Sequence, residues 1–260
     1  MTDQEFKWWI EASHYYVKVF WTGSEYSMSS RWLDEWFGLG EFDVSSKDAR
    51  QLSNRVTDSQ FARLQPVVEG YVSKKVNSSA GFALAPYLFT WNIIRFNQYF
   101  KREPTFSIEN YFDSLGNFIK QEENTVRKFR AKDLAKHGVD NDALRMFERT
   151  NAALRKIGID QNESVGTAKV LHILAPTYFP LVDSPIAERM GLKEQNVSLS
   201  PESYMNWMRR LERLLKAHST AAQRMQKKLN RPILKLIDEG LYVMCTKYGE
   251  LPEMAQELGI

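Results

Sequence analysis

The chain has 260 residues, enough for one large or two small domains with a substantial buried core. Hydrophobic residues make up 43% and charged residues 26%, as in ordinary globular proteins, and no apolar run approaches the roughly 18 residues that span a bilayer. A membrane partner is therefore not expected. The single cysteine, Cys245, excludes an internal disulfide and lies in an apolar stretch typical of a buried, inert thiol. Because residues 1–5 lack the features of a signal peptide, we expect an intracellular protein, cytoplasmic or nucleoid-associated.

The net charge of +3 is small, but its distribution is uneven. Residues 1–60 hold ten acidic and six basic side chains, so this region is acidic. Two later segments are basic, and such clusters either neutralise phosphates or form solvated helix faces; we leave both alternatives open. The first cluster is Arg127, Lys128, Arg130, Lys132 and Lys136, and the second is Arg209, Arg210, Arg213, Lys216, Arg224, Lys227, Lys228, Arg231 and Lys235.

The sequence predicts two helical regions, with loops in the first hundred residues. An acidic, aromatic-rich N-terminal helical region is expected over residues 1–75, and a helical core over residues 76–260. Small polar residues at 22–30 and 73–81 indicate loops. The apolar spacing of 88–99 predicts a helix that ends before Pro104.

Further helices are predicted between residues 106 and 215. Helices are predicted from 106 to 116, from 144 to 157, from 167 to 174 and from 183 to 191, followed by a connector at 192–200. Ser200 and Pro201 open a further amphipathic helix that runs through Leu215. Since strand signals are scarce, we expect an all-α fold of eight to twelve helices, arranged as two lobes around a cleft.

One short segment has the chemistry of a catalytic site. Residues 166–172 read Gly-Thr-Ala-Lys-Val-Leu-His, and Asp183 follows Lys169 by fourteen positions. If Gly166 opens the helix, the positive field of the helix N-terminus and burial favour the uncharged, nucleophilic amine of Lys169. An amine beside a carboxylate is the minimum equipment for Schiff-base chemistry on a sugar. The alternative is that Lys169 is a solvated helix residue and Asp183 a plain N-cap.

This segment resembles the core of the helix-hairpin-helix DNA glycosylases, and within them the archaeal 8-oxoguanine glycosylases. The family's Lys-x-x-x-His-Phe-Leu run and later Asp-x-x-Ile are echoed by Lys169, His172, Ile173, Leu174, Asp183 and Ile186. Residues 163–165 stand where the family hairpin has its first glycine, and the step from the lysine to the histidine is one residue shorter. The match covers about a quarter of the chain.

The resemblance implies a function and the roles of several residues. It implies a base-excision repair glycosylase with AP lyase activity on damaged DNA, in which Lys169 is the nucleophile and Asp183 its electrostatic partner. It also implies a hairpin at the DNA backbone, where we expect Gly166 and Thr167, and further phosphate contacts from the basic cluster, at Arg209, Arg210 and Arg213. DNA is then the partner, and no cofactor or metal is expected.

Other side chains are candidates for substrate contact. His172 either touches the substrate or is a core histidine bonded to a backbone carbonyl. Trp91, Asn92 and Arg95 lie on one predicted helix and are the best candidates for a cleft wall, although most aromatic residues belong to the core. The alternative to an enzyme is a non-catalytic helical protein that binds nucleic acid or another protein through its basic clusters.

Overall fold

We obtained a computed structural model, which describes residues 1–22, 84, 88, 108–157, 163–195 and 197–247. These residues are mainly helical and contain no strand, so the predicted all-α class is confirmed. The helices are α1 (Asp3–Thr22), α6 (Ile108–Gln121), α7 (Glu123–Arg130), α8 (Leu134–His137), α9 (Asp142–Ile157), α10 (Ser164–Leu174), α11 (Ser184–Arg189), α12 (Pro201–Ala217), α13 (Ser219–Leu229), α14 (Ile233–Tyr242) and the π-helical turn η1 (Val243–Lys247).

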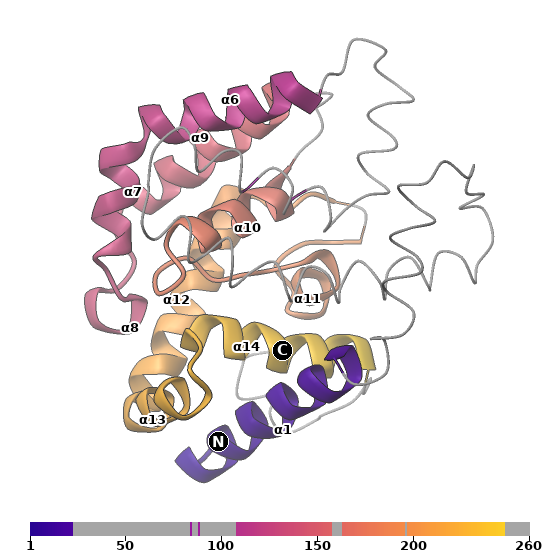
Figure 1. Ribbon diagram of the computed structural model, residues 1–260. Helices are drawn as coiled ribbons and strands as arrows, with labels where there is room; N and C mark the ends of the chain where they lie inside the picture. Colours follow the sequence, from indigo (N-terminus) through magenta and orange to yellow (C-terminus); the bar gives the residue numbers. More distant parts are fainter. Residues whose placement is uncertain (23–83, 85–87, 89–107, 158–162, 196, 248–260) are drawn as a thin grey trace, which may run out of the picture.

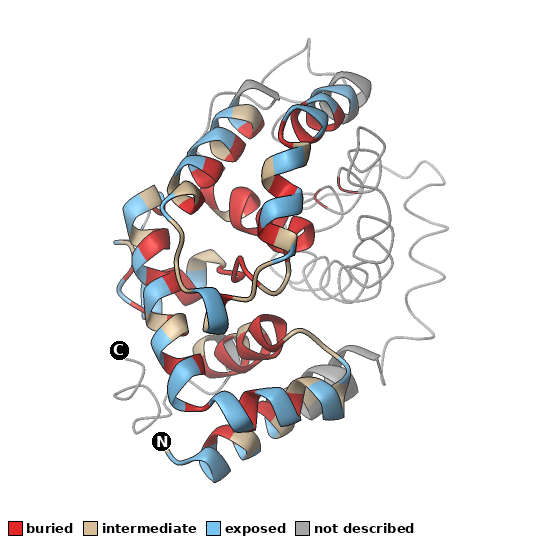
Figure 2. Cartoon of the chain, turned by 90° about the vertical axis from the view of Figure 1, so that its left-hand side faces the viewer, coloured by how far each residue is buried: buried red, intermediate tan, exposed pale blue. Residues whose placement is uncertain are grey.

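The described helices form two groups that α12 joins. Helices α6, α7, α9 and α10 lie together in the upper part of Figure 1, and α1, α13 and α14 lie together below. Helix α12 contacts α9 in the first group and α13 in the second, and it also contacts the short helix α8. Figure 2 colours the chain by burial, and along the described helices buried residues alternate with exposed ones, as expected of helices with one face in the core. The predicted cleft between two lobes stays a prediction.

Helix α12 begins as its sequence predicts. The side chain of Ser200 accepts a hydrogen bond from the backbone N–H of Ser203 at 3.0 Å, and Pro201 follows as the first helical residue. The predicted apolar face is buried and includes Tyr204 and Trp207, both 0% exposed. Helix α12 contacts both α9 and α13, so it connects the two groups of described helices.

Helix α1 is attached to the C-terminal helices. A Cβ on Gly240 of α14 would come within 2.5 Å of the Trp9 ring, so only glycine allows this close approach. His14 also contacts Glu239 at 2.7 Å, and Lys228 of α13 contacts Glu11 at 2.8 Å. The predicted domain boundary between residues 75 and 76 lies outside the described residues.

Several predicted helix boundaries are wrong by a few residues. Helix α6 does not end at Gly116 but continues to Gln121, because Phe118 and Ile119 extend its buried face. Helix α9 begins two residues earlier than predicted and reaches Ile157 as expected. Helix α11 ends at Arg189, and Gly191 beyond it adopts a left-handed φ of 63°. The predicted helix at 88–99, apart from Leu88, lies outside the described residues, as does nearly all of both predicted loops.

Candidate active site

Lys169 lies on the second turn of α10 rather than at its start. The helix begins at Ser164, with Glu163 at the N-cap position, so the prediction that Gly166 opens the helix is wrong. Lys169 is the sixth helical residue, beyond the first turn where the field of the helix N-terminus acts. The residue is nevertheless 6% exposed, so the alternative of a solvated helix residue is also wrong. Burial by tertiary packing, not the helix end, sets the environment of this amine.

Gly166 and Thr167 are interior residues of the first helical turns. Thr167 is 0% exposed, and its backbone N–H donates to the carbonyl of Glu163 at 2.7 Å. A Cβ on Gly166 would lie 3.2 Å from Oε2 of Glu163, so the glycine makes room for a buried carboxylate. Both residues are buried, and their predicted contact with the DNA backbone stays a prediction.

Asp183 is the N-cap of α11. Its Oδ1 accepts a hydrogen bond from the backbone N–H of Ile186 at 2.9 Å, and Pro185 is the second residue of the helix. This hydrogen bond fixes the direction of the carboxylate.

Three buried side chains fix the segment that leads to Asp183. The carbonyl of Phe179 accepts from Nδ1 of His172 at 2.8 Å, so that nitrogen carries the proton. The carbonyl of Pro180 accepts from the hydroxyl of Tyr204 at 2.8 Å, and that of Leu181 accepts from the Trp207 indole at 3.3 Å. Three consecutive carbonyls are therefore satisfied by α10 and α12. His172, at 0% exposure and bonded to a backbone carbonyl, fits the second alternative of a core histidine, and its substrate contact stays a prediction.

Lys169 and Asp183 lie within electrostatic range of each other. Asp183 as a residue is half-buried, but its carboxyl group is enclosed by protein. Burial raises the pKa of Asp183 above its ordinary value, and the charge of Lys169 is the strongest influence in the opposite direction. The Ile186 N–H also favours the ionised form. The carboxyl is consequently a stronger base than an exposed aspartate.

Helix α14 contributes two further charged residues, Lys235 and Asp238, neither of which was predicted to belong to this site. Lys235 was expected in a surface basic cluster, but it is 7% exposed and its Nζ lies 2.7 Å from Oδ2 of Asp238. Burial alone would lower the pKa of Lys235, but the carboxylates of Asp238 and Glu239 outweigh it and raise that pKa. Both Lys235 and Asp238 also act on Asp183. Their i, i+3 spacing within the apolar run 233–241 is the signal that could have revealed them.

Cys245 in η1 lies close enough to Asp183 for the carboxylate to influence its thiol. Burial, with a further contribution from Asp183, raises the pKa of Cys245 to about 11. The group is therefore a protonated thiol near neutral pH, in line with the prediction of an inert cysteine.

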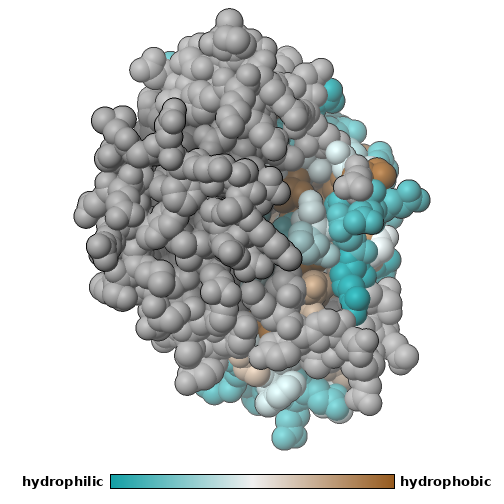
Figure 3. All heavy atoms as spheres, turned by 90° about the vertical axis from the view of Figure 1, so that its right-hand side faces the viewer, coloured by the Kyte–Doolittle hydropathy of each residue, from teal (hydrophilic) through white to brown (hydrophobic). Residues whose placement is uncertain are grey.

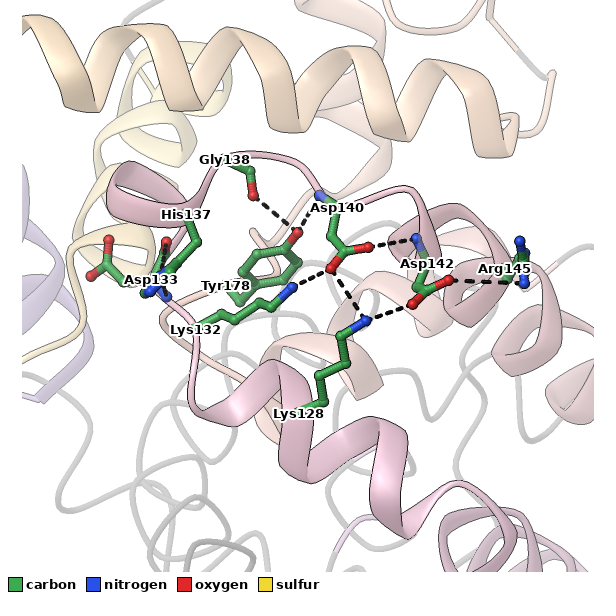
Figure 4. Close-up of polar contacts among 9 residues, drawn as sticks. All are labelled: Lys128, Lys132, Asp133, His137, Gly138, Asp140, Asp142, Arg145 and Tyr178. Atoms are coloured by element: carbon green, nitrogen blue, oxygen red, sulfur yellow. Dashed lines mark hydrogen bonds and ion pairs between the residues drawn. The ribbon is translucent and has the colours of Figure 1, made fainter.

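The first basic cluster is largely neutralised within the protein. Lys132 and Lys128 both pair with Asp140, and Lys128 also contacts Asp142 at 2.6 Å (Figure 4). The hydroxyl of Tyr178 accepts from the Asp140 N–H at 2.6 Å and donates to the carbonyl of Gly138 at 3.1 Å. We call this group the α8–α9 latch; its members are Lys128, Lys132, Gly138, Asp140, Asp142 and Tyr178. It joins α7 and Lys132 to the loop before α9, so its two lysines stabilise the fold.

Several side chains of the second basic cluster are exposed and form no ion pair with a described residue. Arg209 and Arg213 are exposed, and neither forms an ion pair among the described residues. Arg210 instead donates to the carbonyl of Met190 at 2.8 Å, so it links α12 to the end of α11. Arg224 and Lys227 of α13 are likewise exposed without an ion pair in the described part of the chain. The predicted cleft-wall residues Trp91, Asn92 and Arg95 lie outside the described residues.

Comparison of the chain with protein-family models, curated proteins and solved structures finds no match. None of the described helices has the length and apolar character needed to cross a membrane. On the face drawn in Figure 3, the described residues are visible mainly along one edge, where hydrophilic side chains border a smaller hydrophobic area. Within the described ranges, no three His, Cys, Asp or Glu side chains are grouped so as to hold a metal ion.

Proposed function

We propose that this protein is a helix-hairpin-helix-like DNA glycosylase with AP lyase activity, in which Lys169 attacks the sugar of a damaged nucleotide. One observation carries the proposal: a buried lysine is the strongest charged partner of an enclosed aspartate whose pKa is raised. Perturbed, paired ionisable groups of this kind are typical of catalytic sites. The resemblance of residues 166–186 to the glycosylase core supports the same chemistry.

The first chemical step forms a bond between the protein and the sugar. The neutral amine of Lys169 attacks C1′ of an everted nucleotide, and the bond from C1′ to the base nitrogen breaks with its electron pair leaving on the base. The departing base takes up a proton. Asp183 accepts the proton lost from the attacking nitrogen, and its negative charge stabilises the positive charge that develops at C1′.

The second step cuts the strand. Protonation of O4′ opens the sugar ring and leaves a Schiff base between Nζ and C1′. Loss of a proton from C2′ then expels the 3′ phosphate with the electrons of the C3′–O bond, and water hydrolyses the Schiff base to restore Lys169. Exposed cations of α12 and α13, including Arg209, Arg213 and Arg224, are suited to contact the DNA phosphates.

The experiment that tests this proposal is borohydride trapping on oligonucleotides that carry an abasic site or one of a panel of base lesions. Reduction makes the Schiff base permanent, so the wild-type protein should form a covalent adduct. Lys169→Gln should form none, while Lys216→Gln, which removes an exposed lysine of α12, should trap as the wild type does. An adduct at the wild-type level in Lys169→Gln would contradict the proposal.

A second candidate function is supported by the same exposed cations. In a non-catalytic nucleic-acid-binding protein, Arg213, Arg224 and Lys227 would bind phosphates, and Asp183 would serve only as a helix cap. This candidate predicts binding to undamaged DNA with no trapped adduct on any lesion. The two functions therefore separate in the trapping experiment.

A further inference from the structure

Helix α1 places two acidic side chains against the basic helix α13. Oε1 of Glu11 accepts a hydrogen bond from Nζ of Lys228, in the last turn of α13, at 2.8 Å. Oδ1 of Asp3 lies 2.9 Å from Nδ1 of His218, the residue that precedes α13. The two helices contact each other in the lower part of Figure 1. The fold therefore brings the acidic start of the chain onto the second basic cluster.

The two contacts differ in how far solvent reaches them. His218 is 9% exposed and stacks on Phe6 with the ring centroids 5.1 Å apart, so its contact with Asp3 is part of the packed interface. The side chain of Lys228 is 59% exposed and that of Glu11 is 39% exposed. An exposed ion pair adds little to stability, and buried residues such as Phe6 hold α1 in place without it. The Glu11–Lys228 pair can therefore open while α1 stays docked.

Lys228 shares its helix face with two other cations. Arg224 precedes Lys228 by four residues and Lys227 by three, so the three side chains are neighbours on α13. All three are exposed, and Arg224 and Lys227 form no ion pair within the described part of the chain. Among the described residues, Glu11 is the only acid paired with this group. Its carboxylate oxygen occupies the place on the Lys228 ammonium that a phosphate oxygen would take in a complex with nucleic acid.

We propose that α13 is a docking surface for the phosphates of duplex DNA, on which Glu11 covers Lys228 until a phosphate replaces it. This inference rests on the proposed function, and it extends the DNA contacts to a cation that is paired in the free protein. Arg224 and Lys227 attract the DNA backbone first. A phosphate oxygen then takes the Lys228 ammonium, and the Glu11 carboxylate turns to solvent. Since one ion pair replaces another, Glu11 weakens the binding of DNA without blocking it.

The test is fluorescence anisotropy of the full chain with a labelled, undamaged DNA duplex over a salt series. If Lys228 binds a phosphate, Lys228→Gln should reduce the slope of log affinity against log salt by about 0.9. Lys228→Arg, which keeps the charge, should retain the wild-type slope. Lys128→Gln is the matched control, because its lysine is also paired with an acid, Asp142, and it should leave the slope unchanged.

Removal of the covering carboxylate should have the opposite effect on affinity. Glu11→Gln should raise the affinity about twofold to fivefold, because no ion pair then has to open. Glu5→Gln removes the same charge from an exposed residue of α1 whose carboxylate accepts from the Thr2 N–H, so it is the matched control and should gain less. In a Lys228→Gln background, Glu11→Gln should gain no more than Glu5→Gln does.

Three results would overturn the inference: a wild-type slope in Lys228→Gln, equal gains from Glu11→Gln and Glu5→Gln, or a gain from Glu11→Gln that survives the loss of Lys228. Binding of heparin without binding of the duplex would assign the surface to another polyanion and overturn it as well. Borohydride trapping tests the proposed function separately. Trapping with unmoved slopes rejects only α13 as the docking surface, whereas moved slopes with no adduct on any lesion reject the glycosylase and leave the docking surface.

Discussion

The hydroxyl of Tyr204 donates to the carbonyl of Pro180 at 2.8 Å, from the middle of the core to the segment that carries Asp183. The neighbouring carbonyls of Phe179 and Leu181 are bound by His172 and Trp207. Since all three donors are 0% exposed, the approach to α11 is fixed by the core itself. A loop held in this way can orient a catalytic carboxylate as firmly as a helix does.

Tyr204→Phe should lower both stability and reaction rate. The substitution leaves the buried Pro180 carbonyl without its donor, which costs about 1–3 kcal/mol of unfolding free energy, and it loosens the support of Asp183. Tyr178→Phe is the matched control, because it removes a hydroxyl from the α8–α9 latch instead. We expect denaturant unfolding to show a loss in both variants, and single-turnover kinetics to show a slower chemical step only in Tyr204→Phe. An equal rate in both would refute the positioning role.

Asp183→Asn separates catalysis from capping. Asparagine caps a helix about as well as aspartate, so the hydrogen bond to Ile186 persists. The negative charge is lost, and the single-turnover rate should fall on the order of a hundredfold or more. Asp183→Ala should also lose the rate but in addition melt earlier, because its cap is gone. A normal rate in Asp183→Asn would leave only the structural role.

The pH dependence of Asp183→Asn follows from the raised pKa. A carboxyl whose folded pKa lies above its unfolded value stabilises the fold most when it is protonated, and this contribution disappears as the pH rises through the folded pKa. The melting temperature of the wild type relative to Asp183→Asn should therefore improve as the pH falls toward 4. A relative melting temperature that worsens on acidification would show that the Asp183 pKa is lowered instead.

The sequence predicted the elements whose signals are local. The Ser200 cap and the apolar stripe from Tyr204 to Leu215 specify α12, and the structure agrees. The pairing of Lys169 with Asp183 stays a prediction, although the short loop between α10 and α11 keeps the two residues within electrostatic range. Helix starts were harder to predict: α10 begins at Ser164, and the motif does not encode the packing of the buried Glu163 against Gly166.

Long-range charge partners could not be predicted from the sequence. Lys128 and Lys132 look like phosphate ligands until the fold brings Asp140 and Asp142 to them. Lys235 is a partial exception, because its apolar neighbours at 233–241 distinguish it from the exposed Lys227. Tertiary contacts thus decide which basic residues are structural.

The α8–α9 latch should give the protein an acid-sensitive region. The hydrogen bond from Lys132 lowers the pKa of Asp140 to about 2, from an ordinary value of 3.8. The stability that Asp140 provides is therefore present above pH 3.8 and is lost as the pH falls through about 2. Asp140→Asn should melt below the wild type at pH 7, and the difference should shrink across that acidic window. A difference that is constant with pH would contradict the assignment.

DNA affinity should depend on salt through the exposed cations of α12. Each phosphate contact contributes roughly 0.9 to the slope of log affinity against log salt. Replacing Arg209 and Arg213 by Gln should reduce the slope, whereas Lys128→Gln should not, because that lysine is paired with Asp142. Fluorescence anisotropy over a salt series gives the slopes. A larger reduction from Lys128→Gln would place the DNA on α7 instead.

The identity of the nucleophile is the central claim, and peptide mapping of the borohydride-trapped adduct measures it directly. After digestion of the DNA and the protein, mass spectrometry should find the reduced sugar remnant on Lys169, inside a peptide that covers α10. A remnant on Lys169 alone is the predicted result. A remnant on another lysine or on the N-terminal amine, with Lys169 unmodified, would contradict the account.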